Sequence, residues 1–222
     1  LYKIGEFQGR SDFKFVCSAD LQRISTELFK ECANLKKVVL LNQTEMSDYQ
    51  CYCNGVFGKC KQLTEFHAPE LRWIPEICFE KCCSLKTISL QKVEKIDSFA
   101  FTSCAFQAVA FPRLKRIESY AFKNCESLQQ FDAPVVESIG QMAFQGCQKL
   151  NAVHFPAEIE LECREQYCGK CFICRGEVNE VMERGKQLVK RPMMKFMSET
   201  FNQWMRINLK VEKLNRIQNT RK

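Results

Sequence analysis

The chain repeats one short pattern of residues at a nearly fixed interval, and this repeat restricts its fold more than any other feature. In each copy a phenylalanine is followed three residues later by a cysteine, and successive cysteines are 28, 22, 22, 21 and 22 residues apart. The six copies are Phe29–Cys32, Phe57–Cys60, Phe79–Cys82, Phe101–Cys104, Phe122–Cys125 and Phe144–Cys147. Five residues before each phenylalanine stands an isoleucine, replaced by tyrosine in the second copy. An internal period of this length predicts a solenoid in which every repeat is one structural unit.

Each repeat also contains a six-residue segment whose first, fourth and sixth residues are apolar or small. The segments span 35–40, 63–68, 85–90, 106–111, 128–133 and 150–155. This pattern is typical of a short strand, and a proline directly after four of the segments favours a turn there. An extended turn centred on the isoleucine follows, and the segment around the repeat phenylalanine is expected to form one short helical turn. Because one unit cannot bury its own apolar face, the units must stack to form a core.

The segment LKTISLQKVEKIDSFAFTSC, residues 85–104, resembles the BspA-like class of leucine-rich repeats over almost its whole length. The resemblance covers about residues 13–161. It implies an α/β solenoid, a leucine-rich-repeat array with a short strand plus a turn or short helix in each repeat. We expect this solenoid to span residues 1–161, followed by a Cys-rich cap at 162–176 and a basic amphipathic helical tail at 177–222. The resemblance is not specific for function, because such repeats serve adhesion, scaffolding and recognition alike.

The outward-facing residues of the predicted strands are the first candidate binding surface. The fifth residues of the six segments share one column, from which we select His67, Ser89, Asp132 and His154 as binding residues. The two histidines are the only ones in the chain. They lie four strands apart, about 19 Å at ~4.8 Å per strand, so they cannot share an ion or a proton. Asp132 is one strand from His154 and can pair with it through a surface hydrogen bond.

Two departures interrupt the repeat. A six-residue insertion lies between Leu40 and Tyr52, and one residue is missing after Cys104. The loop at about 41–54 carries Cys51 and Cys53, which have no second cysteine pair beside them to complete a metal site. We therefore interpret it as a protruding contact loop with exposed thiols.

A cluster of four cysteines marks the point where the repeat stops. Cys163, Cys168, Cys171 and Cys174 lie within twelve residues, where one repeat cysteine is expected. Four thiolates suit the tetrahedral coordination of Zn²⁺, so one structural zinc ion that closes the solenoid is the first interpretation. Disulfides in an oxidising compartment and free packed thiols are alternatives. An iron–sulfur cluster is less favoured, because the expected Cys-Pro is missing nearby.

The tail at 177–222 is helical by pattern, with a shorter and a longer helix separated at Pro192. It contains 11 Lys and Arg against 5 Glu, a net charge of +6 in a chain of net charge +7. The longer helix has an apolar stripe of residues spaced by three or four. The stripe consists of Met197, Phe201, Trp204, Ile207, Val211, Leu214 and Ile217. Phe201 and Trp204 are therefore candidate binding residues, which pack either on the solenoid itself or on a partner helix or groove.

The function predicted from these features is non-enzymatic. The sequence contains no Gly-rich phosphate loop, no Ser-His-Asp order and no His-Glu-x-x-His motif. We predict a protein-binding or scaffold protein that has no small-molecule substrate. It is expected to contact its partner through the outward strand face, the 41–54 loop or the C-terminal helix. Cell-surface adhesion, which the resemblance implies for many relatives, is one alternative. A nucleic-acid-associated factor that uses the Cys cluster and the basic tail is another, disfavoured because the basic residues are interspersed rather than clustered.

The cysteine count bears on the compartment. Fifteen cysteines cannot all pair within one chain, and they are spread through apolar stretches, which favours a reducing, cytoplasmic setting. The sequon Asn42-Gln43-Thr44 keeps a cell-surface or secreted setting open. No apolar run approaches the ~20 residues of a transmembrane helix.

Overall fold

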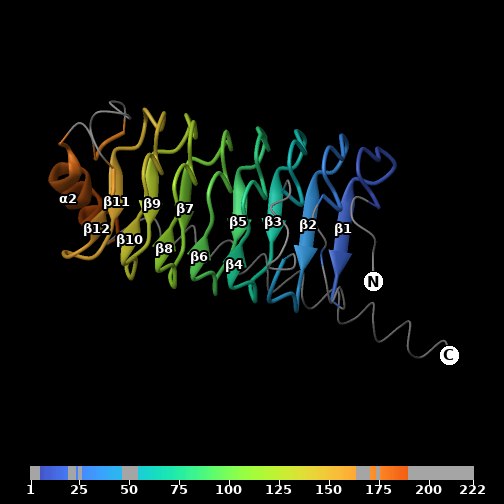
Figure 1. Cartoon of the computed structure of the whole chain (residues 1–222), viewed down its shortest axis with the longest axis horizontal. Helices are drawn as coiled ribbons and strands as arrows, with labels where there is room; N and C mark the ends of the chain where they lie inside the picture. Colours follow the sequence, from blue (N-terminus) through green and yellow to red (C-terminus); the bar gives the residue numbers. More distant parts are fainter. Residues whose placement is uncertain are drawn as a thin grey trace.

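The computed structural model describes residues 6–19, 24, 27–46, 55–163, 171–173 and 176–189. Figure 1 shows an elongated array of strands lying side by side, with β1 near one end and helix α2 at the other. The elements are β1 (Phe15–Ser18), β2 (Lys37–Leu40), β3 (Glu65–His67), β4 (Trp73–Ile74), β5 (Thr87–Ser89), β6 (Lys95–Ile96), β7 (Ala108–Ala110), β8 (Arg116–Ile117), β9 (Gln130–Asp132), β10 (Ser138–Ile139), β11 (Ala152–His154), β12 (Glu160–Leu161) and α2 (Val178–Val189). The solenoid predicted from the repeat is confirmed.

The strands form parallel sheets in which equivalent repeat positions stand opposite each other. One sheet has the order β1-β2-β3-β5, a second β7-β9-β11, and a third β4-β6-β8-β10-β12. His67 is opposite Ser89, and Ile96 is opposite Ile117. The first ladder breaks between β5 and β7, where the repeat is one residue shorter after Cys104. We attribute the break to this shorter turn.

The core of the solenoid is a continuous stack of the repeat phenylalanines. Successive rings from Phe29 to Phe144 have centroids 5.1 to 5.5 Å apart, with interplanar angles of 15° or less. Phe7 extends the stack at one end and Phe172 packs on Phe144 at the other. Inward-facing strand residues such as Phe66 and Phe131 meet the stacked rings edge to face. Each repeat therefore completes the core of the next.

The segment around each repeat phenylalanine is a pair of turns and not the short helical turn that we expected. In one repeat, the N–H of Glu80 bonds the carbonyl of Ile77, and the N–H of Cys82 bonds that of Phe79. Other N–H groups bond the next repeat, as Phe79 does to the carbonyl of Ala100 at 2.8 Å. Five of the six repeats have two positions with positive φ, such as Ile77 and Lys81 near 60°, and the second repeat has one, Lys59. These left-handed residues interrupt a helix and turn the N–H groups toward the neighbouring repeat.

Helix α2 covers the open edge of strand β11, as seen at the orange end of the array in Figure 1. Val181 and Met182 of α2 are buried in the common core. The helix backbone approaches the strand closely at Gly185, where an added Cβ would lie 2.0 Å from the carbonyl oxygen of Val153. A terminal strand that would otherwise offer unpaired backbone groups is thereby protected.

Replacing Gly185 by alanine should therefore destabilise the protein. Alanine is the better helix former by about 1 kcal/mol, so an uncrowded site would become more stable. Here the collision with Val153 costs about 1–3 kcal/mol of overpacking, and we expect a net loss on the order of 1 kcal/mol in urea-induced unfolding. Gln187→Ala, at an exposed position of the same helix, is the control. An increase in stability for Gly185→Ala would mean that α2 does not pack on β11 in solution.

Candidate functional site

The candidate site is the outward column, defined as the fifth residues of the six strand segments. These residues are Val39, His67, Ser89, Ala110, Asp132 and His154. The strand register places Val39 beside His67 and His67 beside Ser89. It likewise aligns Ala110, Asp132 and His154 across β7, β9 and β11. The alignment expected from the sequence is thus present, with the break between β5 and β7 dividing the column.

Asp132 and His154 form a polar pair in the second half of the column. The Nδ1 atom of His154 lies 2.9 Å from Oδ1 of Asp132, and their side chains are 28% and 14% exposed. The imidazole is held in one orientation by a neighbour on the adjacent strand, with part of its surface open to solvent. This geometry provides a fixed hydrogen-bonding group for a partner.

His67 has a different environment in the first half. Its side chain is fully buried, and Nε2 lies 3.4 Å from Oε2 of Glu65, which also pairs with Lys37 at 2.6 Å. Nδ1 of His67 finds no hydrogen-bond partner within the described part of the chain. Burial lowers the pKa of His67, against the opposing effect of Glu65. A buried imidazole of this kind is neutral in the folded protein at neutral pH.

The stability of the protein should consequently fall as the pH falls below neutrality. His67 binds a proton near its ordinary pKa of about 6.5 when unfolded, but only at lower pH when folded. The stabilisation is complete above pH ~6.5 and is lost as the pH falls toward the lowered pKa of the folded state. In His67→Gln the loss between pH 7.5 and pH 5 should be smaller than in the wild type, as measured by urea unfolding. Equal pH slopes for the two proteins would contradict this origin.

The two halves of the outward column differ in accessibility. Val39 and His67 have no exposed surface, and Ser89 retains 4%. Ala110, Asp132 and His154 all keep part of their surface exposed. His67 and Ser89 thus lie in the predicted column but are covered in this structure, whereas Asp132 and His154 are accessible.

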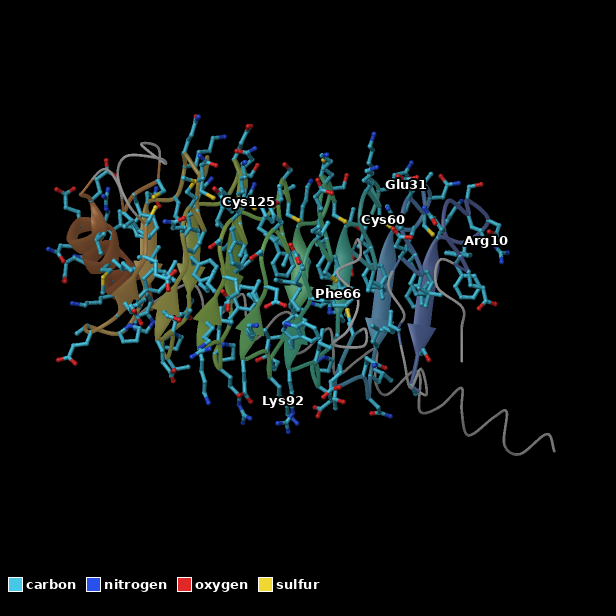
Figure 2. The ribbon with its side chains drawn as sticks, in the orientation of Figure 1. Arg10, Glu31, Cys60, Phe66, Lys92 and Cys125 are labelled. Atoms are coloured by element: carbon cyan, nitrogen blue, oxygen red, sulfur yellow. The ribbon has the colours of Figure 1, made fainter. Side chains whose placement is uncertain are left out.

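The repeat cysteines form a second column with a structural role. The thiol of Cys60 donates to the carbonyl of Phe29 at 2.9 Å, and that of Cys125 to the carbonyl of Phe101 at 3.1 Å. The other four repeat cysteines make the same bond to the phenylalanine of the preceding repeat, or to Phe7, at 3.0 to 3.4 Å. Figure 2 shows Cys60 and Cys125 along one edge of the solenoid, with Lys92 at the opposite edge. Burial raises the pKa of the Cys82 and Cys104 thiols, which keeps them protonated as donors.

Two of the four C-terminal cysteines are described. The Sγ atoms of Cys163 and Cys171 lie 3.7 Å apart. Two thiolates on one zinc ion, with bonds of about 2.3 Å in tetrahedral geometry, are separated by ~3.8 Å, so the pair fits a shared metal. Cys168 and Cys174 lie outside the described residues. Among the residues that are described, no group of three or more metal-ligating side chains occurs.

Cys171 also belongs to the stacking pattern, which the sequence reasoning missed. It is fully buried and directly precedes Phe172, which packs on Phe144. The dipeptide Cys78-Phe79 occurs at the equivalent place in an earlier repeat, and this identity is the signal in the sequence. Phe172 continues the phenylalanine stack six residues later than the usual repeat interval would place it. For this reason the regular pattern seems to end at Cys163.

The insertion is partly built into the solenoid. The carbonyl of Thr44 accepts the N–H of Arg72 at 3.0 Å, and Met46 is fully buried beside Cys78. The Thr44 carbonyl thus bonds the residue just before β4, as the carbonyl of Arg72 bonds Glu94 just before β6. Thr44 therefore extends the third sheet by one hydrogen-bonded position. Cys51 and Cys53 of the 41–54 loop, and Phe201 and Trp204 of the tail, lie outside the described residues.

Comparison with protein families identifies the repeat. A family model described as the BspA type leucine rich repeat region, with six copies, matches residues 5–129 and 53–169. The chain belongs to the BspA-type leucine-rich-repeat family. The resemblance noted in the sequence is thereby confirmed. No curated protein matches the chain in sequence.

Two solved structures of leucine-rich proteins are similar to this chain. A leucine rich cell surface protein from Faecalibacterium prausnitzii A2-165 is 20% identical, with a TM-score of 0.47, and the match covers 78% of this chain and 36% of that one. A leucine-rich repeat protein from Bacteroides ovatus ATCC 8483 is 17% identical, with a TM-score of 0.45, covering 75% of this chain and 61% of that one. The chain thus spans less than two thirds of either protein.

Leucine-rich repeats generally present an extended surface for protein interactions. Within the described residues, none of the helical structure has the length and hydropathy that crossing a bilayer requires.

Proposed function

We propose that this chain is a non-enzymatic protein-binding module whose contact surface is the outward face over β7, β9 and β11. The observation that carries the proposal is the accessible half of the outward column. There the oriented Asp132–His154 pair lies beside the small side chains of Ala108 and Ala110. Small residues let a partner approach the sheet, and the polar pair supplies a fixed donor or acceptor. An extended strand face of this kind suits a protein partner, because repeat arrays use such surfaces to bind proteins.

Site-directed photo-crosslinking on the full chain tests this surface. A photoreactive residue at Ala110 should capture a partner protein, and an excess of unlabelled chain should reduce this capture. The same residue at exposed Glu126 should not capture that protein. The double variant Asp132→Ala, His154→Ala should reduce the capture at Ala110. Equal products from both positions, or capture that the double variant leaves unchanged, would contradict the proposed surface.

Adhesion at a cell surface is the second function that we propose, and membership in the BspA-type family supports it. The cytoplasmic scaffold is the competing setting, supported by the odd number of cysteines and by the thiol donors of the repeat. Labelling of intact cells with a membrane-impermeant biotin reagent separates the two. Labelled chain supports adhesion, and labelling only after lysis supports the cytoplasmic scaffold.

We further propose that Cys163, Cys168, Cys171 and Cys174 hold one structural zinc ion at the end of the solenoid. The spacing of the Cys163 and Cys171 sulfur atoms supports this proposal. When bound, zinc would fix four chain positions around one ion and add to the free energy of folding. Metal analysis of the purified chain should give about one zinc per chain, lost in Cys163→Ser but kept in Cys83→Ser, whose cysteine is exposed. Metal-free protein with all thiols titratable would instead support packed thiols.

A further inference from the structure

Strand β1 is an open edge of the first sheet, whereas the other sheet edges in the described part of the chain are protected. Strand β11 lies under helix α2, and Arg72, just before β4, donates its N–H to the carbonyl of Thr44. Strand β12 carries Glu158, Glu160 and Glu162, all exposed, and a row of like charges on an edge opposes the addition of a similar strand. Strands β5 and β7 lie inside the array, on either side of the break in the ladder (Figure 1).

The outward side chains of β1 are exposed at this edge. The strand register aligns Phe15 with Lys37 and Cys17 with Val39 of β2. The side chain of Phe15 is 52% exposed, and Cys17 is exposed as well. A large aromatic side chain that is open to solvent on an edge strand favours the addition of a further strand.

The backbone of β1 presents hydrogen-bonding groups at the same edge. The N–H of Lys37 bonds the carbonyl of Lys14 in the preceding strand, at 3.2 Å. Phe15 is the register equivalent of Lys37, so its N–H and C=O point in the same direction, to the open side of β1. Cys17 lies two residues further along the strand and faces the same way. These groups of Phe15 and Cys17 find no hydrogen-bond partner within the residues that the structure describes.

We propose that the β1 edge joins the β1 edge of a second copy of the chain, in an antiparallel ladder about a twofold axis. In the register that places Val16 opposite Val16 of the second copy, Phe15 lies opposite Cys17. Both residues carry edge-facing groups, so each of the two reciprocal pairs exchanges both of its N–H···O bonds.

The side chains of β1 also suit this register. The exposed ring of Phe15 lies beside Cys17 of the other copy on the outward face, and each copy thereby covers the exposed residues of the other. Lys14 lies opposite Ser18, so no like charges meet across the strands within residues 14–18. The edge is therefore complementary to itself in both its backbone and its side chains.

The opposite end of the array explains why the partner is a second β1 edge. A head-to-tail contact, in which β1 of one copy adds to the far end of the next, would extend without limit. That end is closed by α2 over β11 and by the acidic side chains of β12. A twofold contact between two β1 edges instead closes at a dimer, and it continues the existing ladder β1-β2-β3-β5 into the other copy.

The dimer should be weak. The end of the phenylalanine stack is already covered, because the guanidinium of Arg10 lies 5.7 Å from the ring centre of Phe7 and 5.5 Å from that of Phe13. The association therefore depends on the edge of a four-residue strand, which buries less than the ~1,200 Å² of a stable interface. We expect a dissociation constant in the micromolar range or above, so unfolding measured on dilute protein reports the monomer.

Sedimentation equilibrium of the full chain under reducing conditions tests the proposal. The average mass should rise with concentration from that of one chain toward that of two, and no further. Phe15→Lys should weaken the association about tenfold or more, because it removes the aromatic cover and places a charge on the edge. Val135→Lys is the matched control and should leave the association unchanged, since Val135 is also a large hydrophobic residue, 45% exposed, but lies outside β1.

A second variant tests the backbone pairing. Cys17→Pro removes an edge-facing N–H, whereas the bonds from β1 to β2 use other residues of the strand. It should weaken the association about tenfold or more while circular dichroism shows an intact fold.

Photocrosslinking of the otherwise unchanged chain tests the register without either variant. A photoreactive aromatic residue at Phe15, in a mixture of isotopically light and heavy chains, should crosslink to the peptide that contains Cys17. These crosslinks should include pairs of light and heavy peptides. Crosslinks that join peptides of the same isotope only would assign the contact to one chain and overturn the proposal.

Three results of the sedimentation measurements would also overturn it. The chain can remain a monomer at every concentration, which would mean that the edge does not pair with itself. It can dimerise equally well in Phe15→Lys and Cys17→Pro, which would assign the contact to another surface. Masses that grow beyond two chains would mean an open-ended contact in place of the twofold one.

Discussion

Phe101→Ala should lower the free energy of unfolding by about 3–5 kcal/mol, the range for removing a large aromatic side chain from a packed core. Phe101 is fully buried, and its ring stacks on Phe79 at 5.1 Å and on Phe122 at 5.3 Å. It also meets Phe106 edge to face at 5.4 Å. Because each repeat contacts only its neighbours, a cavity here interrupts the stack in the middle of the array.

Urea unfolding followed by circular dichroism measures this loss, and Phe15→Ala is the matched control. Phe15 is the same residue type, but its side chain is 52% exposed at the outer strand β1. We expect its replacement to change the stability by less than about 1 kcal/mol. Similar losses for the two variants would show that the phenylalanine stack is not the main source of stability. A broadened or two-step transition in Phe101→Ala would indicate that the two halves of the solenoid unfold separately.

Cys125→Ala should lower the free energy of unfolding by about 2 kcal/mol, the second largest effect. The change removes a buried sulfur atom and leaves the carbonyl of Phe101 without its thiol donor. This carbonyl still accepts the N–H of Cys104 at 3.3 Å, so the lost thiol bond costs about 1 kcal/mol and the cavity left by the sulfur atom supplies the rest. Binding through the outward face should be unchanged, because Cys125 lies inside the solenoid.

The exposed Cys83 is the control for this prediction. Its thiol also donates to a carbonyl, that of Lys81 at 3.3 Å, but in an exposed position where water can replace it. Cys83→Ala should therefore have little effect on stability. Loss of partner capture in Cys125→Ala, with stability unchanged, would contradict the structural role of the repeat cysteines.

The fold could be predicted from the sequence because equivalent residues of successive repeats have equivalent neighbours. Phe79 and Cys82 have the same neighbours as Phe101 and Cys104, so one repeat that fits predicts the others. The thiol hydrogen bonds to the turn backbone recur from repeat to repeat in the same way. The local conformation was predicted less well: the segment around each phenylalanine forms turns with positive φ, as at Phe99 and Ser103, and not a helical turn. Hydrogen bonds to the next repeat outweigh the local helical preference, and sequence periodicity does not report them.

The candidate site was predictable in position but not in accessibility. The period placed His67, Ser89, Asp132 and His154 in one column, and the strand register agrees. That His67 is buried while His154 keeps part of its surface exposed is a difference that the period does not encode. The proximity of Cys163 to Cys171 likewise arises only after the chain has closed around Phe172.

The sequence by itself determined the repeat unit, its inward residues and the family. These features follow from periodic burial, and the same signal occurs in every repeat. The tertiary structure alone decided where the strand ladder breaks, how α2 seals β11 at Gly185, and which half of the outward column is accessible. These features depend on contacts between segments that occur once in the chain, and a single contact leaves no periodic signal in the sequence.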